Sequence, residues 1–330
     1  MGERRCAGTL DGCRKAKAEI VVKKTCIHAL QVAIALAVAF GVLVLLGPFW
    51  PSARVMGLFI TGSVKDCSWE QSLRGARIEA FEKRTSASLG RSSRVIRKES
   101  GLSLVDTPRG PFWIPSGSER TLYQDLAEQD WGIYGQGAEG VRRGDVVLDC
   151  GANIGLFTRM ALRAGARLVV AIEPAPENIE CLRRNLAPEI AKGLVIVYPK
   201  GVWHEDGLLT LNVNAQNSAA DSFVMKWAVG REGPKMPVTT IDHLVAELKL
   251  PHVDIVKMDI EGSERNALMG ARATLIRDKS RMAICVYHLP DDYEVITRLV
   301  ADAAPGYLPR CQCYVERNSI RPHVVRYSRD

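Results

Sequence analysis

Short apolar runs and helical patterns alternate along the second half of the chain. The first run, Val146–Leu148, ends in Asp149 and a glycine-rich turn, and a helical pattern begins near Leu156. Such alternation is typical of right-handed crossovers between parallel strands. It predicts an α/β domain with a mostly parallel sheet. The further predicted strands are Leu168–Ile172, Leu194–Tyr198, Val238–Ile241, Val253–Met258 and Met282–Tyr287.

Other β-like segments flank or interrupt this pattern. Residues 102–115 hold two short apolar runs around a Pro-Arg-Gly-Pro turn, which predicts a hairpin that opens the domain. Helical spacing follows at Leu122–Ala127, and a polar hairpin is expected at Leu208–Val213. Residues Tyr307–Tyr327 predict two more strands, which we expect to form an antiparallel edge. The domain is therefore expected to span residues 101–330.

The N-terminal third has a different pattern. Residues 27–46 contain no formal charge and end before Gly47 and Pro48. At about 1.5 Å per residue, a helix of this length would span the roughly 30 Å hydrocarbon layer of a bilayer. We expect a transmembrane helix, because the run is longer than that of a cleaved signal peptide. A basic tail, 1–26, precedes it, and a stem or linker with one short helix near Ser68–Arg84 is expected over 47–100.

Charge separates the two parts of the chain. Residues 1–100 carry a net charge of +9 and residues 101–330 a net charge of −2. A nearly neutral domain argues against a nucleic-acid partner, whereas basic residues beside an apolar span suit lipid headgroups. Lys and Arg are concentrated before the span, which predicts a cytoplasmic N-terminus and a lumenal or periplasmic domain. A domain on the cytosolic face, or a start at Met56, remains an alternative.

The glycine-rich turn distinguishes between nucleotide ligands. A P-loop is excluded because no Lys follows Gly155, and Asn153 replaces the middle glycine of a dinucleotide-binding turn. Asp149 would also repel a pyrophosphate, whereas the ammonium and sulfonium of S-adenosylmethionine favour a nearby carboxylate. We expect Asp149, Gly151 and Asn153 around the methionine end of this cofactor. Gly151 and Gly155 would let the backbone approach the ligand and the next helix.

Glu173 follows the second predicted strand. A carboxylate at this position can accept hydrogen bonds from both ribose hydroxyls of a nucleoside cofactor. Because dinucleotide enzymes use the same contact, an NAD-dependent oxidoreductase remains an alternative.

A third group of polar residues lies farther along the chain. Asp259 and Glu261 end the strand at Val253–Met258 and His288 follows the next one, so all three are expected at the same edge of the sheet. Lys257 is expected to pair with a neighbouring acid. His288 or Asp259 could act as general base toward an acceptor. Oxygen ligands near Asp259 would suit a divalent metal, but the ligand set is incomplete, so no metal site is predicted.

The cysteines predict no metal site either. Nine are present without a zinc-binding spacing. Cys311 and Cys313 are interpreted as residues on one face of a strand, and Cys150 and Cys285 as small core residues.

Five motifs together carry a family resemblance. In order they are V-L-D-C-G-A-N-I-G, A-I-E-P-A-P-E-N, V-T-T-I-D-H-L, I-V-K-M-D-I-E-G-S-E and V-Y-H-L-P-D-D. Over about residues 102–300 the chain resembles an FkbM-family methyltransferase. The resemblance implies a Rossmann-like class I methyltransferase fold, S-adenosylmethionine as donor, and an acceptor oxygen on a sugar, glycolipid or natural product. A membrane-anchored binding protein with this fold and no activity is the alternative from another class.

Overall fold

The computed structural model describes Thr25 and residues 27–42, 51–214, 217–228, 230–316 and 318–329. The chain divides into two units, residues 1–63 and 64–330.

The first unit contains helical residues 27–42 and helix α2 (Pro51–Ile60). Among the residues that the structure describes, no helix is long and apolar enough to cross a membrane. The predicted transmembrane helix at 27–46 is therefore not supported. Its last four residues, and the predicted basic tail apart from Thr25, lie outside the described residues.

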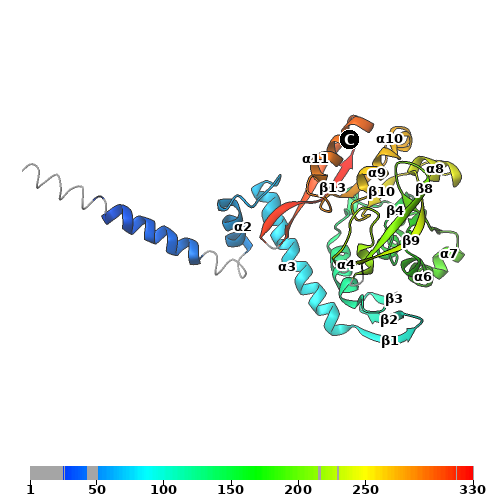
Figure 1. Ribbon diagram of the computed structural model, residues 1–330, viewed down its shortest axis with the longest axis horizontal. Helices are drawn as coiled ribbons and strands as arrows, with labels where there is room; N and C mark the ends of the chain where they lie inside the picture. Colours follow the sequence, from blue (N-terminus) through cyan, green and yellow to red (C-terminus); the bar gives the residue numbers. More distant parts are fainter. Residues whose placement is uncertain are drawn as a thin grey trace, which may run out of the picture. The chain divides into compact units, whose positions relative to one another are not determined.

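A seven-stranded sheet forms the centre of the second unit, in the order β12-β13-β11-β10-β4-β5-β6 (Figure 1). The five strands from β11 to β6 are parallel, whereas β13 runs antiparallel to β11 and to β12. This confirms the predicted parallel sheet with an antiparallel edge. The strands are β4 (Val146–Cys150), β5 (Leu168–Ile172), β6 (Val195–Tyr198), β10 (Ile255–Met258), β11 (Arg281–Cys285), β12 (Leu308–Glu316) and β13 (Ser319–Ser328).

Helices pack on both faces of this sheet because alternate strand residues point to opposite faces. Leu148 and Val256 pack with one set of helices, whereas Val147 and Val169 pack against the other. The first set is α8 (Ile241–Glu247), α9 (Glu264–Met269), α10 (Arg272–Asp278) and α11 (Asp292–Ala303). The second is α5 (Leu156–Arg163) and α6 (Pro176–Asn185), followed by the short α7 (Ala187–Ala191).

The strand order reverses between β4 and β10. From β4 the chain builds outward to β5 and β6, and it later returns to place β10 on the other side of β4. In open α/β sheets, the crevice outside the carboxyl ends of two such strands is where ligands bind. The glycine turn after β4 and the acidic segment after β10 meet there.

Two three-stranded sheets flank the central one. The predicted hairpin is confirmed as β2 (Leu102–Thr107) and β3 (Gly110–Pro115), with β1 (Arg94–Glu99) added beside β2. The other sheet has the order β7-β9-β8. The predicted strand Val238–Ile241 was expected in the parallel series, but it ends at Thr239 within β9, because Thr240 caps α8. The second sheet contains β7 (Gly201–Val202), β8 (Gly207–Asn214) and β9 (Gly230–Thr239).

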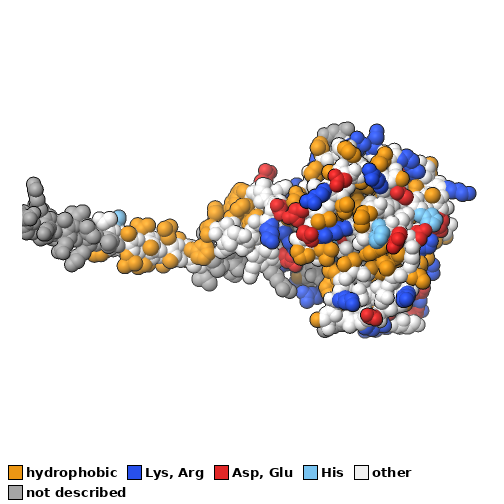
Figure 2. All heavy atoms as spheres, turned by 45° about the horizontal axis from the view of Figure 1, so that its top comes forward, with side chains coloured by type: hydrophobic (Ala, Val, Ile, Leu, Met, Phe, Trp, Pro, Cys, Tyr) orange, Lys and Arg blue, Asp and Glu red, His pale blue; other side chains and the backbone are white. Residues whose placement is uncertain are grey.

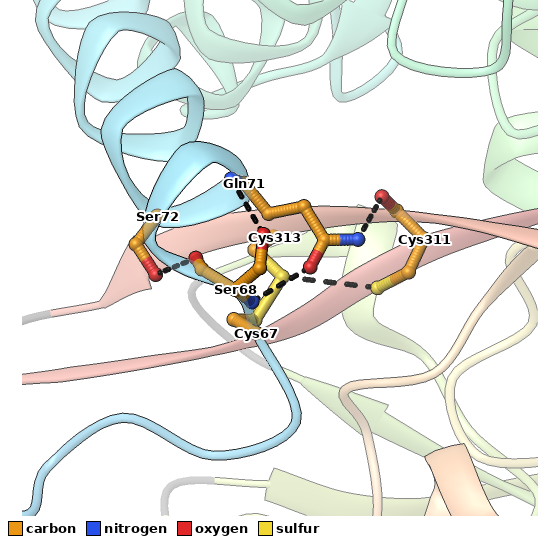
Figure 3. The surroundings of a disulfide bond; sticks show 6 residues. All are labelled: Cys67, Ser68, Gln71, Ser72, Cys311 and Cys313. Carbon is orange, nitrogen blue, oxygen red and sulfur yellow. Dashed lines mark hydrogen bonds between the residues drawn. A yellow bond between two sulfur atoms is a disulfide. The ribbon is translucent and has the colours of Figure 1, made fainter.

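Helix α3 (Trp69–Ser92) differs from the predicted stem. Ser68 and Gln71 form a capping box at its start. The helix packs against β12 and against α4 (Glu119–Trp131), and a Cβ on Gly75 would lie 2.6 Å from the carbonyl oxygen of Cys313. A disulfide joins Cys67 to Cys313 beside this contact (Figure 3). Residues 64–100 therefore belong to the second unit, and the domain boundary predicted at residue 101 lies within it.

Candidate active site

Two adjoining cavities lie at the carboxyl ends of β4, β5 and β10. Glu173, Asn178 and Asp221 line the first cavity, and Tyr134 and Tyr287 line the second, which has a volume of about 250 Å³. The residues common to both linings are Gly151, Asn153, Ala219, Asp259 and Glu261. The predicted residues Gly151, Asn153, Glu173, Asp259 and Glu261 therefore meet at one crevice, whereas Asp149, Gly155 and His288 are absent from the described linings.

The glycine turn after β4 is shaped by close packing as well as by the cavities. Gly151 has φ +79°, and a Cβ there would lie 1.9 Å from the carbonyl oxygen of Asp259. Gly155 has φ +91°, and its Cβ would lie 2.8 Å from Leu186 Cδ1. Both positions need glycine, because L-residues rarely adopt such φ values and the space is already filled.

Glu173 holds this turn against the end of β5. Its Oε2 accepts a hydrogen bond from the Asn153 backbone N–H at 2.9 Å, and its Oε1 accepts one from Ala175 at 2.9 Å. Burial raises the pKa of Glu173 to about 7, although these hydrogen bonds oppose the shift. The carboxyl group lines the first cavity, which is the position expected for a contact with a ribose.

Asp149 lies deeper than expected. It is fully buried and absent from the described lining of both cavities. Its Oδ1 is 3.2 Å from Lys257 Nζ, and its Oδ2 accepts a hydrogen bond from Thr158 at 2.7 Å. The ammonium of Lys257 in turn donates to the carbonyl oxygen of Gly151 at 2.7 Å. The predicted pairing of Lys257 is confirmed, and Asp149 supports the turn from beneath the crevice floor.

The structure brings Asp259, Glu261 and His288 together. His288 Nε2 lies 3.5 Å from Asp259 Oδ1 and 3.5 Å from Glu261 Oε1, while Nδ1 lies 3.1 Å from Glu264 Oε1. Asp259 also accepts a hydrogen bond from the Tyr134 hydroxyl at 2.6 Å. The backbone turns between the two carboxylates, because Glu261 has φ +54° and lies in the left-handed region.

Electrostatics assign different roles to these groups. Burial alone would lower the pKa of His288, but the charges of Glu264 and Glu261 outweigh it and raise that pKa well above its usual value. A protonated imidazole donates hydrogen bonds and cannot accept a proton. Burial raises the pKa of Glu261, whereas Lys257 and His288 overcome burial and lower that of Asp259.

The comparisons with known proteins agree with this geometry. Residues 149–307 match the family model described as the methyltransferase FkbM domain. This region is an FkbM-family methyltransferase domain. The resemblance noted in the sequence is confirmed.

Two curated relatives are each 29% identical to this chain over the aligned residues. The 31-O-demethyl-FK506 methyltransferase FkbM of Streptomyces tacrolimicus aligns over 48% of this chain and 70% of its own length. The hexuronic acid methyltransferase AglP of Haloferax volcanii aligns over 58% of this chain and 76% of its own length. A solved FkbM methyltransferase from Methylobacillus flagellatus has a TM-score of 0.43 and 18% identity, with 76% of this chain and 59% of that chain covered.

The second cavity of the FkbM domain contains acids that sequence reasoning missed. Asp125 and Glu128 lie three residues apart on α4 and line it with Asp259 and Glu261. Burial, followed by the charge of Asp259, raises the pKa of Asp125 to about 7, and burial also raises that of Glu128. Their helical spacing was visible in the sequence, but nothing there indicated which face of the helix meets the crevice.

Proposed function

We propose that the FkbM domain transfers a methyl group from S-adenosylmethionine to a hydroxyl oxygen of a small-molecule or glycan acceptor. The observation that carries this proposal is the junction of the two cavities at Asp259 and Glu261. The family match supports methyl transfer. The relatives' names, one a 31-O-demethyl compound and one a hexuronic acid, support an oxygen acceptor.

The first cavity suits the cofactor. Glu173 is placed to accept hydrogen bonds from the ribose hydroxyls, and Gly151 and Asn153 line the same cavity, where the methionine part would lie. Asp149 acts through Lys257, whose ammonium holds the carbonyl oxygen of Gly151, so it is a positioning residue. The methyl group would then point toward the second cavity, across the shared residues.

The reaction needs an aligned acceptor oxygen and a group that removes its proton. The hydroxyl oxygen forms a bond to the methyl carbon, the carbon–sulfur bond breaks, and the proton leaves the oxygen. Holding the reacting atoms in line supplies much of the rate enhancement. We assign proton removal to Glu261, which faces both cavities, because Asp259 already accepts the Tyr134 hydrogen bond and His288 carries its proton.

The lining of the second cavity favours an acceptor without negative charge. Four carboxyl groups face it, and Lys257 is the single cation among its described lining residues. That ammonium already binds Asp149 and two backbone carbonyl groups. Carboxyl groups bind sugar hydroxyls well, and those that are ionised repel a carboxylate. We therefore expect a neutral polyhydroxylated acceptor rather than an acid of the kind in the relative's name.

Nucleic acid is a poor candidate for the acceptor. Figure 2 shows Lys and Arg side chains interspersed with Asp and Glu on the visible face, without a basic patch that would follow a phosphate backbone.

Methyl-labelled S-adenosylmethionine supplied with paired acceptors, each a neutral glycoside and its uronic acid, tests the reaction. We expect label on the neutral member, and Glu261→Gln should reduce turnover while S-adenosylhomocysteine still binds. Absence of S-adenosylhomocysteine binding to the wild-type protein in calorimetry would refute the cofactor. A thermal shift with NAD in its place would favour the oxidoreductase alternative.

We also propose that the domain works in an oxidising compartment, a lumen or a periplasm. The Cys67–Cys313 disulfide supports this, because such bonds persist where thiols are not kept reduced. Peptide mapping without reductant, on protein from sealed vesicles, tests it together with protease protection. We expect the linked peptides and a protected domain. Free thiols at both positions in native protein would contradict the proposal.

A further inference from the structure

His288 has an unusual environment for a buried histidine. It follows β11, and 2% of its side chain is exposed. Neither ring nitrogen forms a hydrogen bond of good geometry with any residue that the structure describes. Carboxylate oxygens nevertheless lie beside both nitrogens, at 3.1 Å and 3.5 Å. The ring is thus buried and directed at acids without being well bonded to them.

The three acids around the ring carry more negative charge than the imidazole can balance. Asp259, Glu261 and Glu264 face one imidazole. Glu264 is fully buried, and its Oε2 also lacks a hydrogen-bond partner among the described residues. The nearby ammonium of Lys257 is bound to Asp149. Buried carboxylates in excess are costly unless a further cation is bound.

We propose that Asp259, Glu264 and His288 bind one divalent metal ion, and that His288 releases one ring proton to solvent as the ion binds. One ligand atom from each residue, two carboxylate oxygens and a ring nitrogen, lies within 4.8 Å of the others. Ligands held at about 2.1 Å from one ion lie roughly 3 to 4 Å apart, so a small contraction completes the site. If Nδ1 binds the ion, Nε2 keeps the carboxylate of Glu261, 3.5 Å away, as a partner that fixes the ring.

The ligand set indicates the class of ion. Carboxylates suit magnesium and manganese, whereas an imidazole ligand favours first-row transition ions. A mixed set without thiolates therefore points to a divalent transition ion of the manganese or iron type. Sequence reasoning left this ligand set incomplete, because Glu264 appeared only as the last acid of the segment after β10.

The ion would lie where donor and acceptor meet. Asp259 lines both cavities, so an ion bound to it can reach an acceptor hydroxyl. A metal-bound hydroxyl loses its proton more readily, and Glu261 would receive that proton. This role rests on the proposed methyl transfer, whereas binding of the ion does not.

Calorimetry with Mn²⁺ on EDTA-treated full-length protein, without cofactor or acceptor, tests the site. We expect one ion per chain, and we expect His288→Gln and Asp259→Asn each to weaken binding at least tenfold. His243→Gln is the matched control, because His243 pairs with Asp206 at 2.6 Å on the surface, and it should bind Mn²⁺ as the wild type does.

Each outcome separates the two proposals. No Mn²⁺ binding by the wild type, or unchanged binding by both site variants, overturns the metal site even if methyl transfer is active. Binding of one Mn²⁺ without methyl transfer to any acceptor supports the site and refutes the proposed reaction. Should a site variant fail to fold, melting temperatures test the metal site instead. Mn²⁺ should raise the melting temperature of the wild type but not that of Glu264→Gln.

Discussion

Asp149 and Lys257 are register partners on adjacent parallel strands, and their side chains form a buried ion pair beneath the glycine turn. The pair joins β4 to β10 at the point where the strand order reverses. Lys257 also donates a hydrogen bond to the carbonyl oxygen of Gly151. The pair thus supports the turn whose Gly151 lines both cavities.

Breaking this pair should destabilise the fold. Lys257→Met leaves Asp149 as a buried, unpaired charge, and we expect a loss of about 3 to 5 kcal/mol in the free energy of unfolding. The double variant Asp149→Asn with Lys257→Met should recover much of it. Lys200→Met, which removes an exposed partner of Glu247, is the control and should cost at most about 1 kcal/mol. Equal stability of the single and double variants in urea unfolding would contradict this account.

Glu173→Gln should weaken cofactor binding more than it weakens the fold. The amide places a donor where the carboxylate accepts hydrogen bonds from backbone N–H groups and, in our proposal, from the ribose. We expect S-adenosylhomocysteine to bind roughly ten- to a hundredfold more weakly, which corresponds to about 1.5 to 3 kcal/mol. Glu177→Gln, exposed on the same segment, should bind normally in calorimetry. Unchanged affinity of Glu173→Gln would exclude the ribose contact.

The sequence predicted those features of the fold and the site that depend on local periodicity. Strand parity placed Lys257 beside an acid, and the carboxyl ends of the strands brought Glu173 and Asp259 to one crevice, with His288 buried beside Asp259. Glu261 also lies at this crevice as expected, although its left-handed backbone interrupts the alternation of the strand. Residue 67 and its partner at 313 are separated by 246 residues, and no local pattern relates them. The sequence predicted a short helix at Ser68–Arg84 but not the packing of α3 against the domain, because its contact with β12 uses small residues such as Gly75, which carry no apolar signal.

Glu82 should make stability depend on pH. Its side chain is buried on α3, and burial raises its pKa to about 7, from a usual value of 4.5. Because the folded state binds this proton more tightly than the unfolded state, the stabilisation is present below pH 4.5 and is lost as pH rises to 7. As pH rises from 4.5 to 7, the stability of Glu82→Gln relative to the wild type should therefore increase by about 3 kcal/mol, as measured in thermal melts. Glu70→Gln, exposed on the same helix, should show no such trend. A pH-independent difference for Glu82→Gln would contradict the assignment.

The disulfide should stabilise the domain by tying α3 to β12. Closing a loop of this length restricts the unfolded chain, and Cys67→Ser should cost about 3 to 5 kcal/mol. The Cys311 thiol provides a close control, because its Sγ lies 3.8 Å from that of Cys313, at hydrogen-bonding distance, but is not part of the disulfide (Figure 3). Cys311→Ser should melt near the wild type. Dithiothreitol should lower the melting temperature of the wild type and of Cys311→Ser, but not that of Cys67→Ser. A wild-type melting temperature that is the same with and without reductant would show that the bond contributes nothing to stability.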